Sequence, residues 1–217
     1  MPRGIFITFE GSEGCGKTTQ VQRLARRLKT AGHRVVETRE PGGTAIGEEI
    51  RHLLQFSKAG HAMCAEAELL LFTASRAQLV REVIAPALAA GTTVIADRFL
   101  DSTTVYQGVA RRLNPGVVRF VNAFAVGEYK PDLTFVLDLD LDTARRRLLQ
   151  RPTDKPDRME QQPAQFYRDV RDGYLRLAKR EPERIRVIDA GAAVEEIETT
   201  IWSNVERLLK SERALIS

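Results

Sequence analysis

The chain carries Gly11-Ser12-Glu13-Gly14-Cys15-Gly16-Lys17-Thr18 between an apolar run at residues 5–9 and an amphipathic pattern that begins at Lys17. The spacing G-x-x-x-x-G-K-T, placed between a strand and a helix, is typical of a phosphate-binding loop. Glycines allow the backbone to curl so that its N–H groups point inward, and the helix adds the positive end of its dipole. We therefore expect a strand–loop–helix unit that binds the phosphates of a nucleoside triphosphate.

The residues of this loop differ in the chemistry that we expect of them. Lys17 is predicted to reach the β- and γ-phosphates, and Thr18 to offer its hydroxyl to Mg²⁺. Two interpretations of Cys15 stay open, because a thiol among phosphate-binding amides favours thiolate chemistry and a small residue can equally fill the loop. The predicted ATP-binding set comprises Gly11, Ser12, Glu13, Gly14, Cys15, Gly16, Lys17, Thr18 and Thr19.

Length and composition bound the kind of molecule. A chain of 217 residues is long enough for one domain, 1–217, with a sizeable core. No apolar run approaches the roughly 20 residues that cross a membrane, so we expect no membrane partner. Two cysteines are too few for a disulfide scaffold, and a reduced, cytoplasmic setting is therefore expected.

The charge balance is basic, with 33 Lys and Arg residues against 29 Asp and Glu residues and a pI of about 9.3. Such a balance can indicate nucleic-acid binding. The excess is only +4, however, and arginines concentrate at residues 145–147, 151 and 158. Nucleotide phosphates explain that concentration as well as DNA does, and we expect no nucleic-acid partner.

Short β-branched runs alternate with amphipathic patterns, which predicts a parallel sheet covered by helices on both faces. We expect an α/β fold of the P-loop NTPase type, with three α/β/α layers around a five-stranded parallel sheet. Asn114-Pro115 is predicted to start a helix, and Pro86 to kink or end the long one. The predicted strands are residues 5–9, 34–38, 92–96, 133–137 and 185–188, and the predicted helices are residues 17–31, 45–55, 65–90, 102–113, 115–127, 141–150, 163–180 and 194–210.

One segment departs from this alternation. Arg151-Pro152-Thr153-Asp154-Lys155-Pro156-Asp157-Arg158 is polar, carries two prolines and joins two predicted helices. A surface loop is one interpretation, and a lid that closes over the phosphates and brings cations with it is the other. The arginines on both flanks favour a lid insertion at about residues 150–162.

Two segments at strand ends indicate a second pocket beside the loop. Ligands of open parallel sheets bind at the carboxyl ends of the strands. Thr38-Arg39-Glu40-Pro41-Gly42-Gly43-Thr44 lies at the carboxyl end of the second predicted strand, and Asp97-Arg98-Phe99 ends the third. Asp97 is expected to hold a magnesium-bound water, and Arg98 to clamp a phosphate with both arms of its guanidinium.

A third segment adds an aromatic side chain to this pocket. Phe72 and Arg76 lie four residues apart and share one helix face, where a ring and a guanidinium could stack on and hydrogen-bond one nucleobase. A phenylalanine among leucines also suits a core position, and periodicity alone does not separate the two. The chain has no N-K-x-D motif after a strand, so a GTPase is not favoured. A kinase for a small acceptor fits the three segments better.

With these residues assembled, the chain resembles the bacterial branch of the thymidylate kinases from residue 5 to about residue 209. The resemblance rests on several motifs: the phosphate loop with Glu13, T-R-E-P-G-G-T at 38–44, L-F-x-A-x-R-A-Q at 71–78, D-R-F-x-D-S-T-x-x-Y-Q-G at 97–108, P-D-L-T at 131–134 and D-R-M-E at 157–160. It implies transfer of the γ-phosphoryl of ATP to dTMP with Mg²⁺ on a nucleoside monophosphate kinase-like fold. It also implies a homodimer, for which the long helix at 65–90 could supply a face.

The resemblance further implies a role for each residue of the second pocket. Phe72 would stack on the thymine ring, Arg76 and Gln107 would bond its edge, and Arg98 would hold the acceptor phosphate with Arg39 or Arg51. Glu13 would lie near the sugar and Mg²⁺, and Tyr106 against the 2′ position. The residues expected to bind dTMP are Glu13, Arg39, Glu40, Arg51, Phe72, Arg76, Arg98, Ser102, Thr103, Tyr106 and Gln107. The residues expected to act in catalysis are Lys17, Arg98, Arg151 and Arg158. The expected metal ligands are Thr18 and Asp97.

The phosphate loop lacks the arginine that eukaryotic-type members carry there, so the cation for the transferring phosphoryl is expected from the lid, at Arg151 or Arg158. Two alternative functions remain. One is another nucleotide or deoxynucleoside kinase on the same fold, and the other is a P-loop ATPase without a phosphoryl acceptor.

Overall fold

Five short runs form one parallel sheet at the centre of the computed structural model, which describes residues 3–150 and 157–214. The strand order is β2-β3-β1-β4-β5, so β1 lies in the middle and its neighbours come from distant parts of the chain. The strands are β1 Phe6–Glu10, β2 Val35–Arg39, β3 Thr93–Asp97, β4 Leu133–Asp138 and β5 Ile185–Asp189. Each predicted strand is thereby confirmed to within one residue at its start.

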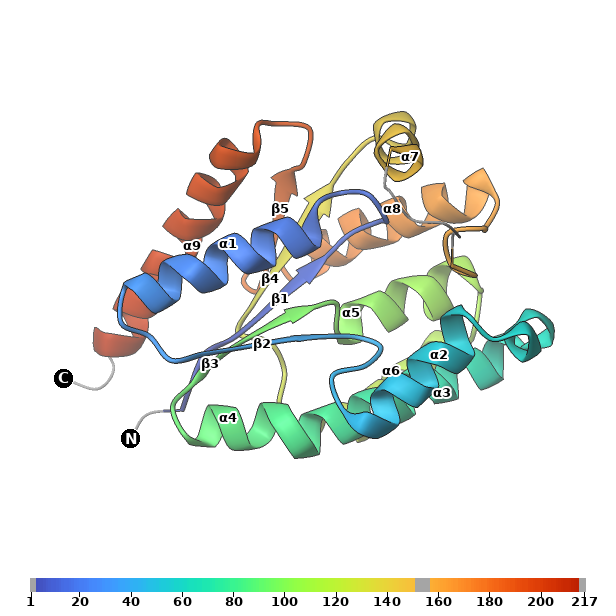
Figure 1. Ribbon diagram of the computed structural model, residues 1–217, viewed down its shortest axis with the longest axis horizontal. Coiled ribbons are helices and arrows are strands. Elements are labelled where there is room, and N and C mark those ends of the chain that lie inside the picture. Colours follow the sequence, from blue (N-terminus) through green and yellow to red (C-terminus); the bar gives the residue numbers. More distant parts are fainter. Residues whose placement is uncertain (1–2, 151–156, 215–217) are drawn as a thin grey trace.

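Helices cover both faces of this sheet and give the predicted three layers (Figure 1). The α-helices are α1 Lys17–Thr30, α2 Ala45–Gln55, α3 Ala65–Leu79, α4 Ala85–Ala89, α5 Leu100–Thr103, α6 Pro115–Val126, α7 Leu141–Leu149, α8 Ala164–Arg180 and α9 Val194–Ala214. A 3₁₀ turn, η1 Lys58–Ala62, and two π-helical segments, η2 Val80–Ile84 and η3 Thr104–Ala110, complete the described helical structure. None of the helices in this part of the chain combines the length and apolar character that crossing a membrane requires.

Alternating side chains of the strands separate two layers of core. Ile7 and Phe9 of β1 pack with Leu24 of α1 and Val205 of α9 on one face. Phe6 points to the opposite face, where it joins the core made by α3, η2 and α4. A shift of register by one residue would turn these side chains to the wrong layers, so the pattern fixes how the strands pair. This register brings the carboxyl ends of β1, β2 and β3 together.

The long helix predicted at 65–90 is present but not regular. Pro86 has no N–H for an i→i−4 bond, and the turn before it widens into η2, where the Ala85 N–H donates to the Val80 carbonyl. The helix continues to Ala89 instead of ending at the proline. The expected start at Asn114 is confirmed, because its side chain caps α6 by accepting from the Gly116 N–H at 2.8 Å.

A second π-helical segment, η3, was not predicted. It replaces the regular helix expected at 102–113 and follows α5 directly. It carries Tyr106 and Gln107, and the Arg111 N–H donates to the Tyr106 carbonyl at 2.9 Å. The wider turn changes the angular spacing of side chains, and π-helical turns occur frequently at functional sites.

Candidate active site

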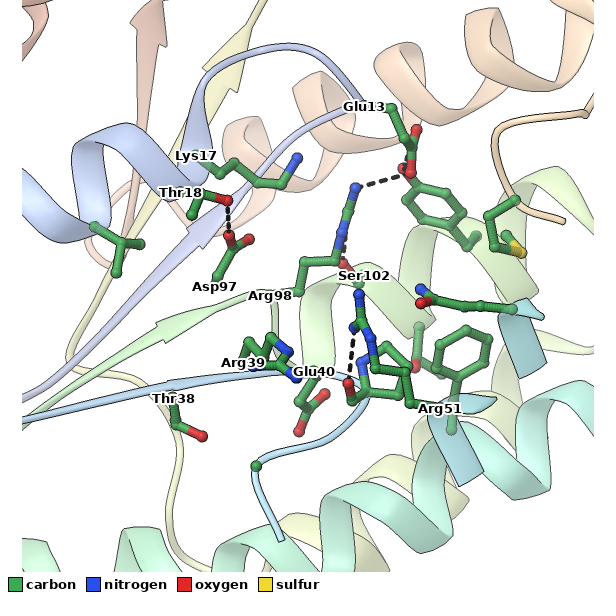
Figure 2. A pocket seen from close by; sticks show the side chains of 18 of the residues that line it. Glu13, Lys17, Thr18, Thr38, Arg39, Glu40, Arg51, Asp97, Arg98 and Ser102 are labelled. Atoms are coloured by element: carbon green, nitrogen blue, oxygen red, sulfur yellow. Dashed lines mark hydrogen bonds and ion pairs between the residues drawn. The ribbon is translucent and has the colours of Figure 1, made fainter. Parts of the chain in front are cut away.

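A cleft of about 460 Å³ opens at the carboxyl ends of β1, β2 and β3 (Figure 2). Its wall combines the phosphate loop, the segment after β2, the end of β3, one face of α3 and the start of η3. Predicted site residues that line it are Glu13, Lys17, Thr18, Arg39, Glu40, Arg51, Phe72, Asp97, Arg98, Ser102, Thr103, Tyr106 and Gln107. The topology therefore gathers residues from 13 to 107 around one cavity, as expected for an open parallel sheet.

The phosphate loop has the left-handed backbone that its glycines predict. Gly11 and Gly14 have φ of 134° and 76°. A Cβ at Gly14 would lie 2.7 Å from the Ala144 carbonyl oxygen, so a side chain is excluded there. Lys17 folds over the loop, and its Nζ donates to the Ser12 carbonyl at 2.7 Å. Thr19 lies in the first turn of α1 as an exposed residue and does not line the cleft.

Cys15 packs beneath this loop. Its side chain is 2% exposed and belongs to the core between the sheet and α1, with Sγ 3.5 Å from Lys17 Nζ. This burial supports the interpretation of Cys15 as a small residue that fills the loop. The thiolate interpretation stays a prediction.

Thr18 and Asp97 offer adjacent oxygen atoms at the junction of α1 and β3. The Thr18 hydroxyl donates to Asp97 Oδ2 at 2.6 Å, a contact drawn in Figure 2. Hydroxyl and carboxylate oxygens suit Mg²⁺, which usually retains waters and phosphate oxygens as its other ligands. No group of three or more His, Cys, Asp or Glu side chains is placed to hold a metal in residues 3–150 and 157–214. The pair therefore fits Mg²⁺ that arrives with a nucleotide.

Arg98 is held in a strained backbone conformation that places its guanidinium over the cleft. Its φ is 72°, which is unusual for a residue other than glycine. Nη2 donates to Glu13 Oε1 at 2.9 Å, and Nη1 donates to the Ser102 hydroxyl at 3.1 Å. The guanidinium also lies 5.1 Å from the ring centroid of Tyr106. These contacts fix a cation between the phosphate loop and η3.

Glu13 and Tyr106 line the cleft beside Arg98 and contact each other. The Tyr106 hydroxyl donates to Glu13 at 2.9 Å to Oε1 and 3.0 Å to Oε2. Burial raises the pKa of Tyr106 well above its ordinary value, so the phenol remains a donor. The loop and η3 are thus joined directly by these two side chains.

Glu10, which the sequence did not indicate as a site residue, holds the backbone next to Arg98 in place. Its carboxylate is fully buried and accepts from the Phe99 N–H at 2.8 Å, the Ser102 hydroxyl at 2.6 Å and the Tyr174 hydroxyl at 2.8 Å. Burial, and next the charge of Asp101, raise the pKa of Glu10. These bonds hold the turn that follows Arg98. The sequence feature that could have indicated this role is a charged residue at the end of an otherwise apolar strand.

Two further arginines line the cleft, Arg39 at the end of β2 and Arg51 on α2. Arg39 pairs with Glu48 at 2.9 Å on the exposed rim. The guanidinium of Arg51 donates to the Pro41 carbonyl at 2.9 Å. Burial, and next the charge of Arg39, lower the pKa of Arg51. With Arg98, the two side chains make this end of the cleft suited to an anion.

Arg76 lies below the cleft and not on its surface. It is 1% exposed, and its five N–H groups are used within the protein. Nε donates to Glu40 Oε2 at 2.9 Å, Nη1 to Thr103 and Asn122 at 3.0 and 2.8 Å, and Nη2 to Glu40 and to the Phe99 carbonyl. A bond from Arg76 to a base, which the resemblance implies, would require one of these bonds to be given up.

The other side chains that the resemblance assigns to the base line the cleft between α3 and η3. Phe72 is partly buried and lines the cleft together with Thr103 and Gln107. Gln107 is 1% exposed, and its Nε2 donates to Glu68 Oε1 at 2.8 Å. An aromatic face and an amide therefore lie on the same side of the cavity.

Arg158 is bound to the end of α2 and does not line the cleft. Its Nε donates to the Leu54 carbonyl at 2.8 Å, and its backbone N–H donates to the Gln55 carbonyl at 3.1 Å. These carbonyls belong to the last turn of α2, where arginines are favoured partners. Arg158 is absent from the lining of the cleft, although Asp157 is part of it. In this arrangement Arg158 anchors the segment after residue 156 to α2, its catalytic role stays a prediction, and Arg151 lies outside the described residues.

Replacing Arg76 with methionine tests its structural role. Arg76→Met should lower the free energy of unfolding by about 3–5 kcal/mol, because it leaves the Glu40 carboxylate buried without its partner. Arg39→Met is the matched control, since Arg39 pairs with Glu48 on the surface and should cost at most about 1 kcal/mol. Urea denaturation of both variants measures the difference, and equal costs would contradict the structural role.

Comparison with known proteins identifies the family of the chain. The family model described as thymidylate kinase matches residues 9–201. The thymidylate kinase of Geobacter sulfurreducens is 49% identical over 202 residues, covering 91% of this chain and 94% of that protein. That of Deinococcus radiodurans is 47% identical over 210 residues, covering 94% and 98%. The crystal structure of thymidylate kinase from Ehrlichia chaffeensis superimposes with a TM-score of 0.75 at 33% identity, covering 94% of this chain and 99% of that one. The chain belongs to the thymidylate kinase family.

Proposed function

We propose that the chain transfers the γ-phosphoryl of ATP to dTMP, forming dTDP and ADP. The observation that carries this proposal is a single cleft with two different ends. One end is the phosphate loop with Lys17, and the other combines Phe72 and Gln107 with three arginines. A P-loop ATPase without an acceptor has no need of the second end. The kinship with thymidylate kinases supports thymine as the base.

The donor phosphates would bind along the loop and the first turn of α1. The backbone N–H groups of the loop and the start of the helix attract anions. Lys17, now bound to carbonyls of the loop, would turn its ammonium group to the β- and γ-phosphates. Thr18 and Asp97 would hold Mg²⁺, which neutralises negative charge on the phosphates during transfer.

The acceptor would lie across the other end of the cleft. Phe72 offers a face for stacking on the base, and Arg98, with Arg39 and Arg51, faces the acceptor phosphate. That phosphate needs no general base, because the second pKa of a phosphate monoester is about 6 and the attacking oxygen is already ionised near neutral pH. Catalysis would therefore depend on alignment of the two phosphates and on neutralisation of their charge.

The bond between Tyr106 and Glu13 supports discrimination at the sugar. The phenol and the carboxylate occupy the space between the phosphate loop and η3, beside Arg98. We propose that Tyr106 lies against C2′ of the acceptor and that Glu13 lies near its 3′ hydroxyl. A ribose 2′ hydroxyl would then compete for space with the ring.

Parallel assays of ADP formation with dTMP, dUMP, dCMP, AMP and no acceptor test the function. We expect the highest kcat/KM with dTMP and little hydrolysis without acceptor. Phe72→Ala should raise the KM for dTMP by about 10- to 100-fold, the equivalent of one base-stacking contact. Phe56→Ala, at an exposed site on the end of α2, is the control. Preference for another acceptor would contradict the assignment of the base, and hydrolysis independent of acceptor would contradict the kinase.

The cation that stabilises the transferring phosphoryl is proposed to be Arg151. Of the two arginines of the lid segment, Arg151 is favoured, because the guanidinium of Arg158 is already bound to the end of α2 and to Glu68. A positioned arginine of this type contributes about 10³- to 10⁵-fold in rate.

Arg151→Ala should therefore lower kcat by at least about 10²-fold, with a smaller change in the KM for dTMP. Arg158→Ala should lower kcat less and should reduce thermal stability, since it frees the segment after residue 156 from α2. Arg145→Ala, at an exposed position of α7, controls for loss of positive charge near the cleft. A full kcat in Arg151→Ala would exclude this residue as the cation.

A homodimer is proposed through α6 and the neighbouring α3. Large apolar side chains are exposed on α6 at Val117, Phe120 and Phe124, with exposed fractions of 52%, 73% and 77%. Their spacing of three and four residues places them on one helix face. Leu70 on α3, which packs against α6, is 58% exposed. Exposed clusters of this kind are typical of interfaces.

A charge placed in this surface should prevent dimerisation. Phe120→Glu should sediment as a monomer at concentrations at which the unchanged chain is a dimer, because the carboxylate would be buried in the interface. Leu149→Glu changes an equally exposed apolar residue on α7 and should leave the dimer intact. A dimeric Phe120→Glu variant, or an unchanged chain that is monomeric, would exclude this interface.

A further inference from the structure

A buried carboxylate joins the base pocket to the segment that follows residue 156. Glu68 of α3 is 1% exposed and lies one helical turn before Phe72. Its Oε1 accepts from Gln107 Nε2 at 2.8 Å and from Arg111 Nε at 3.2 Å. Arg158 Nη2 lies 2.7 Å from its Oε2, as an ion pair whose N–H is not aligned for a hydrogen bond. Glu68 has no contact with the phosphate loop among these interactions, and the mechanism above does not use it.

These contacts form a closed ring of side chains. Arg111 binds Glu68, and its Nη1 donates to Gln162 Oε1 at 2.9 Å. Gln162 Nε2 then donates to the Arg158 carbonyl at 2.9 Å, and Arg158 returns to Glu68. Two guanidinium groups thus face one carboxylate in a largely buried setting. Such a network holds its members in a single arrangement, since each has partners on two sides.

The carboxylate of Glu68 remains ionised in this setting. Burial opposes ionisation, but hydrogen bonds from Arg111 and Gln107 and the charges of both arginines lower its pKa below the ordinary value. An ionised carboxylate has no hydrogen to donate and only accepts hydrogen bonds. Gln107 must therefore turn its amide nitrogen, and not its oxygen, toward Glu68. The amide oxygen is left on the opposite side of the amide group.

We propose that Glu68 is a positioning residue for base recognition, which fixes the Gln107 amide so that its oxygen faces the bound base as a hydrogen-bond acceptor. This inference rests on the proposed function, because it concerns the acceptor end of the same cleft. Thymine and uracil carry an N3–H donor on the edge that Gln107 would meet. Cytosine carries a lone pair at N3, so two acceptors would face each other. The carboxylate thereby selects against cytosine without touching the base.

The test compares three acceptors in the unchanged chain and in Glu68→Gln. Deoxyuridylate and dCMP both lack the 5-methyl group, so the ratio of their kcat/KM values reports the hydrogen-bonding edge alone. A glutamine at position 68 can donate to Gln107, which frees that amide to turn over. The dUMP-to-dCMP ratio should fall at least about tenfold, the size of one misdirected hydrogen bond. The dTMP-to-dUMP ratio, which reports the methyl pocket, should change less than about twofold because Phe72 is unaffected.

Two further variants make the result decisive. Glu66→Gln makes the same change at an exposed position of α3 and should alter neither ratio. Glu68→Asp keeps the charge for the two arginines but withdraws the carboxylate from Gln107, so its dUMP-to-dCMP ratio should also fall. This variant decides the question if Glu68→Gln does not fold.

An equal fall in kcat/KM with all three acceptors, or an unchanged dUMP-to-dCMP ratio of kcat/KM in the folded variants, would overturn the inference. Glu68 would then have a structural role only. An unchanged chain that phosphorylates dTMP but does not prefer dUMP over dCMP would also overturn it, with the proposed function intact. Absence of dTMP turnover in both the unchanged chain and Glu66→Gln would instead remove the proposed function.

Discussion

The buried ion pair between Arg76 and Glu40 connects several elements beneath the cleft. It joins α3 to the segment after β2, and through Thr103 and Asn122 it reaches α5 and α6. Both side chains are almost completely buried, at 1% and 3% exposure. Desolvation of such a pair is costly, and burial raises the pKa of Glu40 to about 7 against the opposing charge of Arg76. The pair is therefore better explained as a device that fixes geometry than as a large net source of stability.

Two other buried carboxylates repeat this arrangement at different places under the cleft. Glu10 holds the turn after β3 through the Phe99 N–H, and this turn carries Arg98 with its positive φ. Glu68 holds Gln107 on the opposite wall. Each carboxylate is below the surface, and each restrains a side chain that faces the cavity. Preorganised donors and acceptors lower the cost of reorganisation when ligands bind, which is what alignment of two phosphates requires.

The sequence was sufficient for the architecture and for most of the cavity wall. The strands could be predicted because short runs rich in β-branched residues alternate with amphipathic helical patterns, and the phosphate loop could be assigned from its spacing alone. The π-helical segments were not predictable, since widening of a turn at Pro86 or at residues 104–110 depends on packing and not on a local motif. The position of Asp97 beside the phosphate loop, in contrast, is expected from the rule that the carboxyl ends of parallel strands meet at one edge of the sheet.

Roles that depend on distant partners could not be deduced in the same way. The spacing of Phe72 and Arg76 placed them on one helix face, but it could not reveal that every N–H of Arg76 is already bound within the protein. Likewise, the local sequence around Arg158 could not reveal that its guanidinium contacts the Leu54 carbonyl and Glu68. These partners are separated by about 100 and 90 residues in the chain, and nothing in the local sequence marks them.

A crystal structure of the chain with dTMP and a non-hydrolysable ATP analogue tests the central claim of one cleft with two phosphate-binding ends. The account predicts the triphosphate inside the loop, with Lys17 Nζ moved from the Ser12 carbonyl to the phosphates. It also predicts the thymine ring against Phe72 and the acceptor phosphate within hydrogen-bonding distance of Arg98. A thymidylate bound away from Phe72 and Arg98, or a triphosphate bound outside the loop, would contradict it.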